Sequence, residues 1–189
     1  MRHNHRAAFW AALYASGALV LTTQGTPIYA HEKELLGLPV ILEHQLVAPE
    51  PFLLQPSFSG CTVQVFLPVN PDFEQQVVEL VNDHRHSVNR PPLKRVTLLD
   101  EAARYHARDM REDDYFSHDT RDRVNGVPEF VCSWHTRIGS HYPGWSSIGE
   151  NIAAGHSSPH SVMNAWLSST YHRNNIESTN FREIGVGFD

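Results

Sequence analysis

The distribution of proline most constrains how this chain of 189 residues folds. Proline lacks a backbone N–H, so it interrupts helices and is excluded from central strands. We therefore expect an extended lead-in over 31–70, with the alternating residues 62–67 as a short strand, and a regular domain over 71–189. The prolines of the lead-in are Pro39, Pro49, Pro51, Pro56 and Pro68.

The first thirty residues have the pattern of a secretory signal peptide. Arg2 and Arg6 flank the start of a mostly apolar run over 7–21, and a polar stretch then leads to Ala30. A run of about fifteen residues fits a signal peptide and is shorter than the roughly 20 apolar residues that span a bilayer. We predict cleavage of 1–30, a secreted, periplasmic or extracellular protein, and no stable membrane span afterwards. A single membrane anchor is the alternative.

Export bears on the two cysteines, Cys61 and Cys132. In an oxidising compartment two cysteines most simply form one disulfide. The bond would connect the lead-in to a loop of the domain, and two free thiols are the alternative. Two thiolates alone cannot supply the four ligands of a structural zinc site.

Composition argues against a nucleic-acid partner. Hydrophobic residues make up 41% of the chain, which is enough for a core, and the net charge is −6 with histidines neutral. Phosphate recognition needs a dense field of lysine and arginine, whereas the lysines here are Lys33 and Lys94.

Two helices are predicted early in the domain. Asn70 is a good N-cap and Pro71 fits the first helical position, and apolar residues at helical spacing follow them. The second helix is predicted over 99–114, where His106 falls on the apolar face and is expected to be a buried, hydrogen-bonded core residue.

In the later part of the domain we predict a helix, a strand and a long loop. A third helix is predicted to begin with Ser158 as its cap and Pro159 as its first residue. Residues 183–188 alternate like a strand. The stretch 119–147, rich in glycine, proline and aromatic residues, is expected to be a long irregular loop.

Six segments, in the same order, resemble the motifs of bacterial extracellular members of the CAP superfamily. This superfamily comprises cysteine-rich secretory proteins, antigen 5 and pathogenesis-related 1 proteins, which share the SCP domain. The segments span about residues 72–188. They are FEQQV with VN from Phe73, LLDEAARYHARDM from Leu98, YFSH from Tyr115, GENI from Gly149, AW with HRNNI from Ala165 and His172, and EIGVG from Glu183.

The resemblance implies an α+β fold, a three-layer α/β/α sandwich with a small antiparallel sheet between helical layers. This chain ends at Asp189, where the family usually continues into a further strand. We expect a sheet that lacks this last strand and exposes an edge. Two interpretations stay open: the chain is a fragment, or residues 62–67 fill the edge.

The resemblance also implies a cleft that can hold a divalent metal such as zinc. The matching motifs assign His118, Glu150 and His172 as its ligands. Imidazole and carboxylate groups suit zinc, and three protein ligands leave one position open. Animal and plant members of the family often carry a second glutamate three residues after the tryptophan, which many bacterial relatives lack. In this chain the position three residues after Trp166 is Ser169. The missing carboxylate weakens metal affinity and any two-carboxylate mechanism.

Each of these residues also has a structural interpretation. His118 could cap a helix, Glu150 could bond to backbone amides, and His172 could lie on the surface. Trp166 is expected to be a core residue.

These features favour a secreted binding or interaction module for an unidentified peptide, glycan or lipid. A metal-dependent extracellular hydrolase with Glu150 as its base is one alternative, and a structural protein of the cell envelope is another. We favour binding because no serine lies in a nucleophile-elbow motif and neither cysteine has a catalytic motif around it. Enzymatic activity stays open on the sequence alone.

Overall fold

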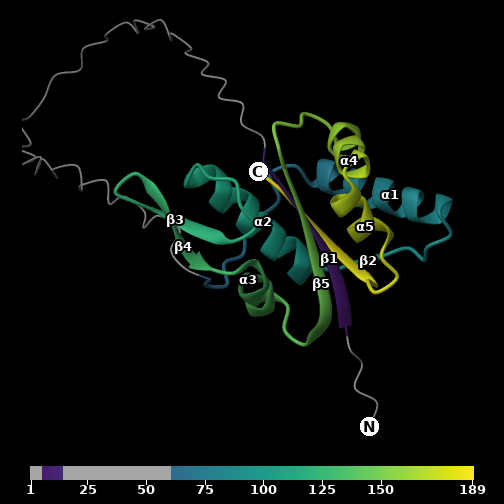
Figure 1. Ribbon diagram of the computed structural model, residues 1–189, viewed down its shortest axis with the longest axis horizontal. Coiled ribbons are helices and arrows are strands. Elements are labelled where there is room, and N and C mark those ends of the chain that lie inside the picture. Colours follow the sequence, from purple (N-terminus) through teal and green to yellow (C-terminus); the bar gives the residue numbers. More distant parts are fainter. Residues whose placement is uncertain (1–5, 15–60) are drawn as a thin grey trace, which may run out of the picture. The chain divides into compact units, whose positions relative to one another are not determined.

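The computed structural model describes the backbone of residues 6–14 and all of residues 61–189 (Figure 1). Most of the predicted signal peptide and most of the proline-rich lead-in lie outside the described residues. Within the described part of the chain, no helix has both the length and the apolar character needed to cross a membrane.

A four-stranded sheet forms the centre of the domain, in the order β2-β6-β1-β5. Its strands are β1 (Arg6–Tyr14), β2 (Lys94–Arg95), β5 (Trp145–Ala154) and β6 (Glu183–Phe188). All three neighbouring pairs are parallel. β1 pairs with a strand on each side, so that Trp10 lies opposite both Glu150 and Gly185. β5 is therefore an edge strand.

The α+β class is confirmed, but the direction of the strands in the main sheet is not the antiparallel one that the resemblance implied. The reason is that β1 occupies the position between β5 and β6 and runs in the same direction as both. β1 also lies within the predicted signal peptide. Cleavage at about Ala30 stays a prediction, and it would remove β1 from the sheet.

Residues 62–67 form no strand, contrary to the expectation. The backbone oxygen of Gln64 lies 3.4 Å from Nε2 of His141. The ring of Phe66 packs near Tyr105, with centroids 6.4 Å apart, and the guanidinium of Arg108 lies 4.9 Å from the centre of that ring. Because β1 fills the position between β5 and β6, that place in the sheet is not available to this segment.

Helices α2 (Thr97–Glu112) and α3 (Trp134–His141) cover one face of the sheet (Figure 1). α2 lies directly on β6 because β6 presents glycine to it. A Cβ atom added to Gly185 would lie 2.2 Å from the carbonyl carbon of Leu99, and one added to Gly187 would lie 2.1 Å from the backbone nitrogen of Arg104. Such distances exclude any side chain at either glycine.

Helices α1 (Pro71–Ser87), α4 (Pro159–Ser168) and α5 (Thr170–Glu177) cover the other face (Figure 1). The predicted caps are present: Asn70 accepts from the Phe73 N–H at 3.0 Å, and Ser158 accepts from the Ser161 N–H at 3.2 Å. Trp166 is 1% exposed in the core of this face, as predicted. The same buried cluster includes Phe73, Val77, Val81, Val162, Ile176, Ile184 and Val186.

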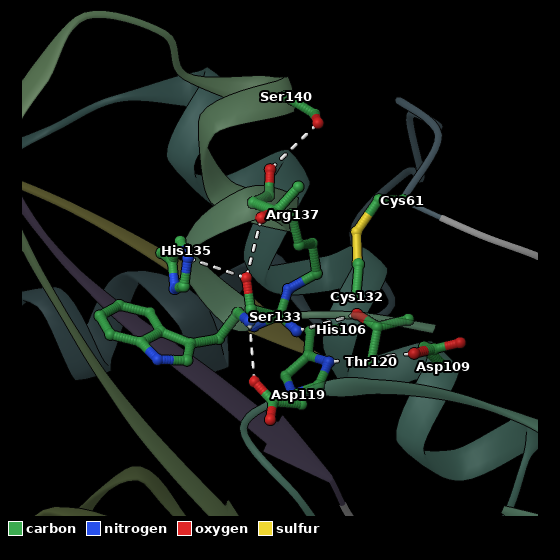
Figure 2. Close-up of a disulfide and its surroundings, with 12 residues drawn as sticks. Cys61, His106, Asp109, Asp119, Thr120, Cys132, Ser133, His135, Arg137 and Ser140 are labelled. Carbon is green, nitrogen blue, oxygen red and sulfur yellow. Dashed lines mark hydrogen bonds and ion pairs between the residues drawn. A yellow bond between two sulfur atoms is a disulfide. The ribbon is translucent and has the colours of Figure 1, made fainter. Parts of the chain in front are cut away.

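The stretch 119–147 is more regular than expected, because it holds the hairpin of β3 (Thr120–Val124) and β4 (Val127–Cys132) as well as α3. Asn125 and Gly126 join the two strands, both with positive φ, at 52° and 82°. An Asn-Gly pair at a two-residue turn is a strong hairpin signal that the sequence analysis overlooked. A disulfide joins Cys132, at the end of β4, to Cys61, with 6.2 Å between their Cα atoms (Figure 2).

Candidate functional site

Two of the three predicted site residues are in direct contact. His118 lies between α2 and β3, and Glu150 lies in β5. Nδ1 of His118 is 2.8 Å from Oε1 of Glu150. The Glu150 side chain is 2% exposed, whereas that of His118 is 46% exposed. The pair therefore joins a buried carboxylate to an imidazole that solvent can reach.

Arg137 completes this arrangement and was missed by the sequence analysis. Its guanidinium forms an ion pair with Oε2 of Glu150, inside the protein. It also donates to the carbonyl oxygen of His118 at 2.8 Å. A further bond runs to the hydroxyl of Thr120 at 3.1 Å (Figure 2). One buried arginine thus holds both the carboxylate and the backbone that carries the imidazole.

A weak sequence signal for Arg137 exists. The residue stands three positions after Trp134 and next to Ile138, which is fully buried. Arg137 therefore lies on the apolar side of the helix, where an apolar residue is expected. Buried arginines are rare unless they are paired with an acidic group. The sequence does not name the partner, because Glu150 lies in a different element.

The charge of Arg137 decides the ionisation of Glu150. Burial alone would raise the pKa of Glu150, but the Arg137 charge, followed by the effects of His106 and His118, outweighs it and lowers the pKa to about 2. Glu150 is therefore ionised at neutral pH, and its oxygens can only accept hydrogen bonds. Nδ1 of His118 must then be the donor, so that Nε2 is the ring nitrogen left to face another group.

His172, the third predicted residue, lies in α5, and its backbone is bonded to β5. Its backbone oxygen accepts from Nδ2 of Asn151 at 3.1 Å, and Asn175 donates to Oδ1 of Asn151 at 2.9 Å. These bonds attach α5 to β5. The pKa of His172 is lowered, first by burial and then by the charge of His118, so the two imidazoles influence each other.

The ligand atoms of His118, Glu150 and His172 do not form a group within 4.8 Å of one another. Among the described residues, the potential ligands whose atoms all lie within 4.8 Å of one another are a different group, Asp109, Asp113 and Asp122. Both oxygens of Glu150 are already engaged, by His118 and Arg137.

A pocket of about 300 Å³ lies against the His118–Glu150 pair. This volume is at the lower end of the range for small-molecule sites. The pocket combines polar groups with the apolar surfaces of a tryptophan and an isoleucine. Its lining residues are His118, Trp134, Ile148, Gly149, Glu150 and Asn175.

The donor set fits a metal that is held by imidazole nitrogen, with Glu150 in a supporting role. In metal sites a histidine ligand usually donates its other ring N–H to a carboxylate, which fixes the tautomer and the ring orientation. His118 and Glu150 have this relationship. The geometry therefore suits Nε2 of His118 as a ligand and Glu150 as the group that orients it, in place of the ligand role that the resemblance implied for Glu150.

The fold and the site together define a class of protein: an α/β/α domain with an imidazole–carboxylate pair beside a pocket at the edge strand of its sheet. The family model of CAP, the cysteine-rich secretory protein family, matches residues 78–189, and the chain belongs to this family. The resemblance seen in the six motifs is thereby confirmed.

The chain is also similar to three proteins of Bacillus. It is 36% identical over 116 residues to the uncharacterized protein YkwD of Bacillus subtilis, a match that covers 61% of this chain and 42% of that protein. It is 28% identical over 116 residues to the uncharacterized membrane protein YlbC of Bacillus subtilis, covering 61% and 31%.

The third similar protein has a crystal structure and is an extracellular protein from Bacillus anthracis that contains a SCP domain. The match has 30% sequence identity and a TM-score of 0.56, and it covers 66% of this chain and 42% of that one. The chain therefore spans less than half the length of each of these three relatives.

Proposed function

We propose that this protein is a secreted binding module whose ligand enters the pocket beside His118. The observation that carries the proposal is the hydrogen bond from His118 to the ionised Glu150, which presents a fixed imidazole to an open pocket. Export is supported by the extracellular relative from Bacillus anthracis and by the signal-peptide pattern of 1–30.

His118 and His172 are the proposed metal ligands, with Glu150 orienting His118. Two imidazoles are fewer protein ligands than the three typical of a catalytic zinc site, so we expect modest affinity and several positions for water or ligand. When bound, zinc supplies an electrophilic contact for a ligand oxygen or nitrogen.

The pocket suits a peptide side chain or a sugar better than a lipid chain. Its volume is small, and Asn175 and His118 offer hydrogen-bonding groups beside the flat surface of Trp134. An aromatic surface next to convergent polar groups is a common arrangement in pockets that recognise polar ligands.

A hydrolase that uses Glu150 as its base is less well supported. A general base works best when its pKa lies near the operating pH, whereas the pKa of Glu150 is about 2. The ion pair with Arg137 and the bond to His118 also engage both of its oxygens.

Zinc titration by calorimetry tests the metal part of the proposal. We expect the protein to bind about one zinc ion and His118→Ala with His172→Ala to abolish binding. Glu150→Gln should weaken binding by roughly 10- to 100-fold, as is typical when a carboxylate partner of a ligand is removed. The exposed His160 supplies the control, since His160→Ala should bind zinc normally. An absence of zinc uptake at neutral pH would remove the metal from the proposal.

Ligand binding is tested separately on peptide and glycan arrays. We expect His118→Ala to reduce a positive signal and His160→Ala to leave it unchanged. Chelator-sensitive cleavage of a peptide or ester library, lost in Glu150→Gln, would instead favour the hydrolase.

A further inference from the structure

Three carboxylates meet where the end of α2 approaches β3, away from the imidazoles of the proposed site. Asp109 lies in the last turn of α2, Asp113 caps the C-terminus of that helix, and Asp122 lies in β3. One oxygen from each lies within 4.8 Å of the other two. Asp109 and Asp113 are buried, at 0% and 5% exposure, and Asp122 is half-buried.

Two of these carboxylates have a buried oxygen without a hydrogen-bond partner in the structure. Oδ2 of Asp109 accepts from the hydroxyl of Tyr115, and Oδ1 of Asp113 accepts from the backbone N–H of Arg123 at 3.1 Å. Oδ1 of Asp109 and Oδ2 of Asp113 have no such partner. A buried carboxylate oxygen without a donor is costly, so these atoms call for a positive partner.

Two arginines near Asp109 and Asp113 are engaged with other groups. Arg137 forms its ion pair with Glu150. The guanidinium of Arg123 donates to the backbone carbonyl oxygens of Asp113, Asp114 and Gly126. His106 contributes no charge at neutral pH, because burial lowers its pKa to about 3, and its Nδ1 lies 4.0 Å from Oδ2 of Asp109 (Figure 2). Among the residues that the structure describes, Oδ1 of Asp109 and Oδ2 of Asp113 therefore stay buried without a positive partner.

We propose that Asp109, Asp113 and Asp122 bind a divalent cation of the hard, oxygen-seeking class, with calcium as the first candidate. Calcium takes carboxylate oxygens at about 2.3–2.6 Å, so two oxygens on one ion lie at most about 5 Å apart, and the observed spacing satisfies this limit. An all-carboxylate set favours calcium, magnesium or manganese over zinc. This site is chemically distinct from the imidazoles of His118 and His172.

The cation would act as a clamp on the segment that carries His118. That segment leaves α2 at Asp113 and enters β3 before Asp122, so an ion shared by these residues joins its two ends. The disulfide at Cys132 attaches the partner strand β4 to the lead-in. The ion would connect β3 to the end of α2, and the disulfide connects β4 to Cys61.

Thermal unfolding of the full chain, with calcium, magnesium or manganese against chelator, tests the proposal. We expect the melting temperature to rise by several degrees with at least one of these ions, because a ligand that binds only the folded state stabilises it. Asp122→Asn and Asp113→Asn should lose this shift. The matched control is Asp114→Asn, whose carboxylate is 89% exposed and lies outside the cluster.

The double variant His118→Ala with His172→Ala distinguishes this proposal from the proposed zinc site. This variant should keep the full rise in melting temperature with calcium. A negative result for the zinc site therefore does not affect the test of the carboxylate site. If the cluster variants do not fold, terbium luminescence of the wild type, excited through tyrosine and reversed by calcium, reports the site directly.

Burial raises the pKa of Asp109 to about 7, with Asp113 adding to this effect and the Tyr115 hydrogen bond opposing it, so a proton competes for the same oxygens. Two results would overturn the proposal. One is a wild-type melting temperature that none of the ions changes, which would mean that a shared proton alone relieves the charge. The other is a shift that survives in Asp122→Asn and Asp113→Asn.

Discussion

The carboxylate of Glu150 meets the guanidinium of Arg137 inside the protein, where their side chains are 2% and 0% exposed. This ion pair joins β5 to α3. It keeps Glu150 ionised and so sets the direction of the hydrogen bond with His118. Arg137 therefore governs the site although it does not line the pocket.

Removing Arg137 should be strongly destabilising, because it leaves the charge of Glu150 buried without its partner. We expect Arg137→Ala to lower the free energy of unfolding by about 3–5 kcal/mol, measured by urea denaturation. Adding Glu150→Gln to this variant should restore part of the loss, since the second change removes the unpaired charge. A loss below about 1 kcal/mol would show that the pair contributes little.

The stability of the protein should depend on pH through His106. The pKa of His106 is lowered to about 3 by burial, with the Arg137 charge adding to this effect, from an ordinary value of 6.5. The unfolded chain therefore binds more protons between these values. The contribution of neutral His106 to the free energy of unfolding is complete above pH 6.5 and declines as the pH falls toward 3.

Denaturant unfolding across this range, compared with His106→Gln, measures the effect. We expect the wild type to lose up to about 4 kcal/mol more than the variant between pH 7 and pH 3. Asp109, whose pKa is raised, acts in the opposite direction between about pH 4 and pH 7, but it is present in both proteins. If the free energy of unfolding depends on pH equally in the two proteins, His106 is not the group responsible.

The contact of α2 with β6 should not tolerate a methyl group at Gly187. A Cβ atom there would lie 2.1 Å from the backbone nitrogen of Arg104, which cannot move without shifting the helix. We expect Gly187→Ala to lower the free energy of unfolding by about 2 kcal/mol or more. Gly139→Ala is the control, because its Cβ would lie 3.4 Å from Trp145 in ordinary contact. Similar effects of the two changes would argue against this packing.

The disulfide between Cys61 and Cys132 should stabilise the exported protein. Its sequence separation is 71, and closing a loop of that size adds up to about 4 kcal/mol on the chain-entropy model. Non-reducing mass spectrometry should show the linked peptides, and Cys61→Ser with Cys132→Ser should melt at a lower temperature. Free thiols in the exported protein would contradict the pairing.

Loss of β1 should weaken the sheet, because β5 and β6 pair with it along most of their length. We expect a protein lacking residues 1–30 to unfold at lower denaturant concentration than the full chain, and to associate through the exposed strand edges. Sedimentation and urea denaturation measure the two effects. Equal stability and a monomeric state in both proteins would show that β1 is dispensable.

Local signals in the sequence predicted the elements whose causes are local. Asn70 and Ser158 cap their helices through bonds to backbone groups three residues away, and that spacing is visible in the sequence. The alternation over 183–188 likewise predicted β6. The hairpin at Asn125–Gly126 has an equally local signal, because the Asn-Gly pair favours the positive φ angles of its turn.

The strand order could not be predicted in the same way. Which segment lies between β5 and β6 depends on competition between distant segments for the same backbone groups. Residues 6–14 pair there, whereas 62–67, which also alternate, form no strand. A pattern of alternation indicates a strand but does not identify its partners.

By itself, the sequence determined where the capped helices begin, the identity of the family through its six motifs, and the candidate residues His118, Glu150 and His172. Only the tertiary structure decided what these residues do, because burial and charge depend on neighbours from other elements. Glu150 is held ionised by Arg137 from α3, and Asp109 meets Asp122 from β3. Electrostatic interactions act through space, and the folded chain alone sets those distances.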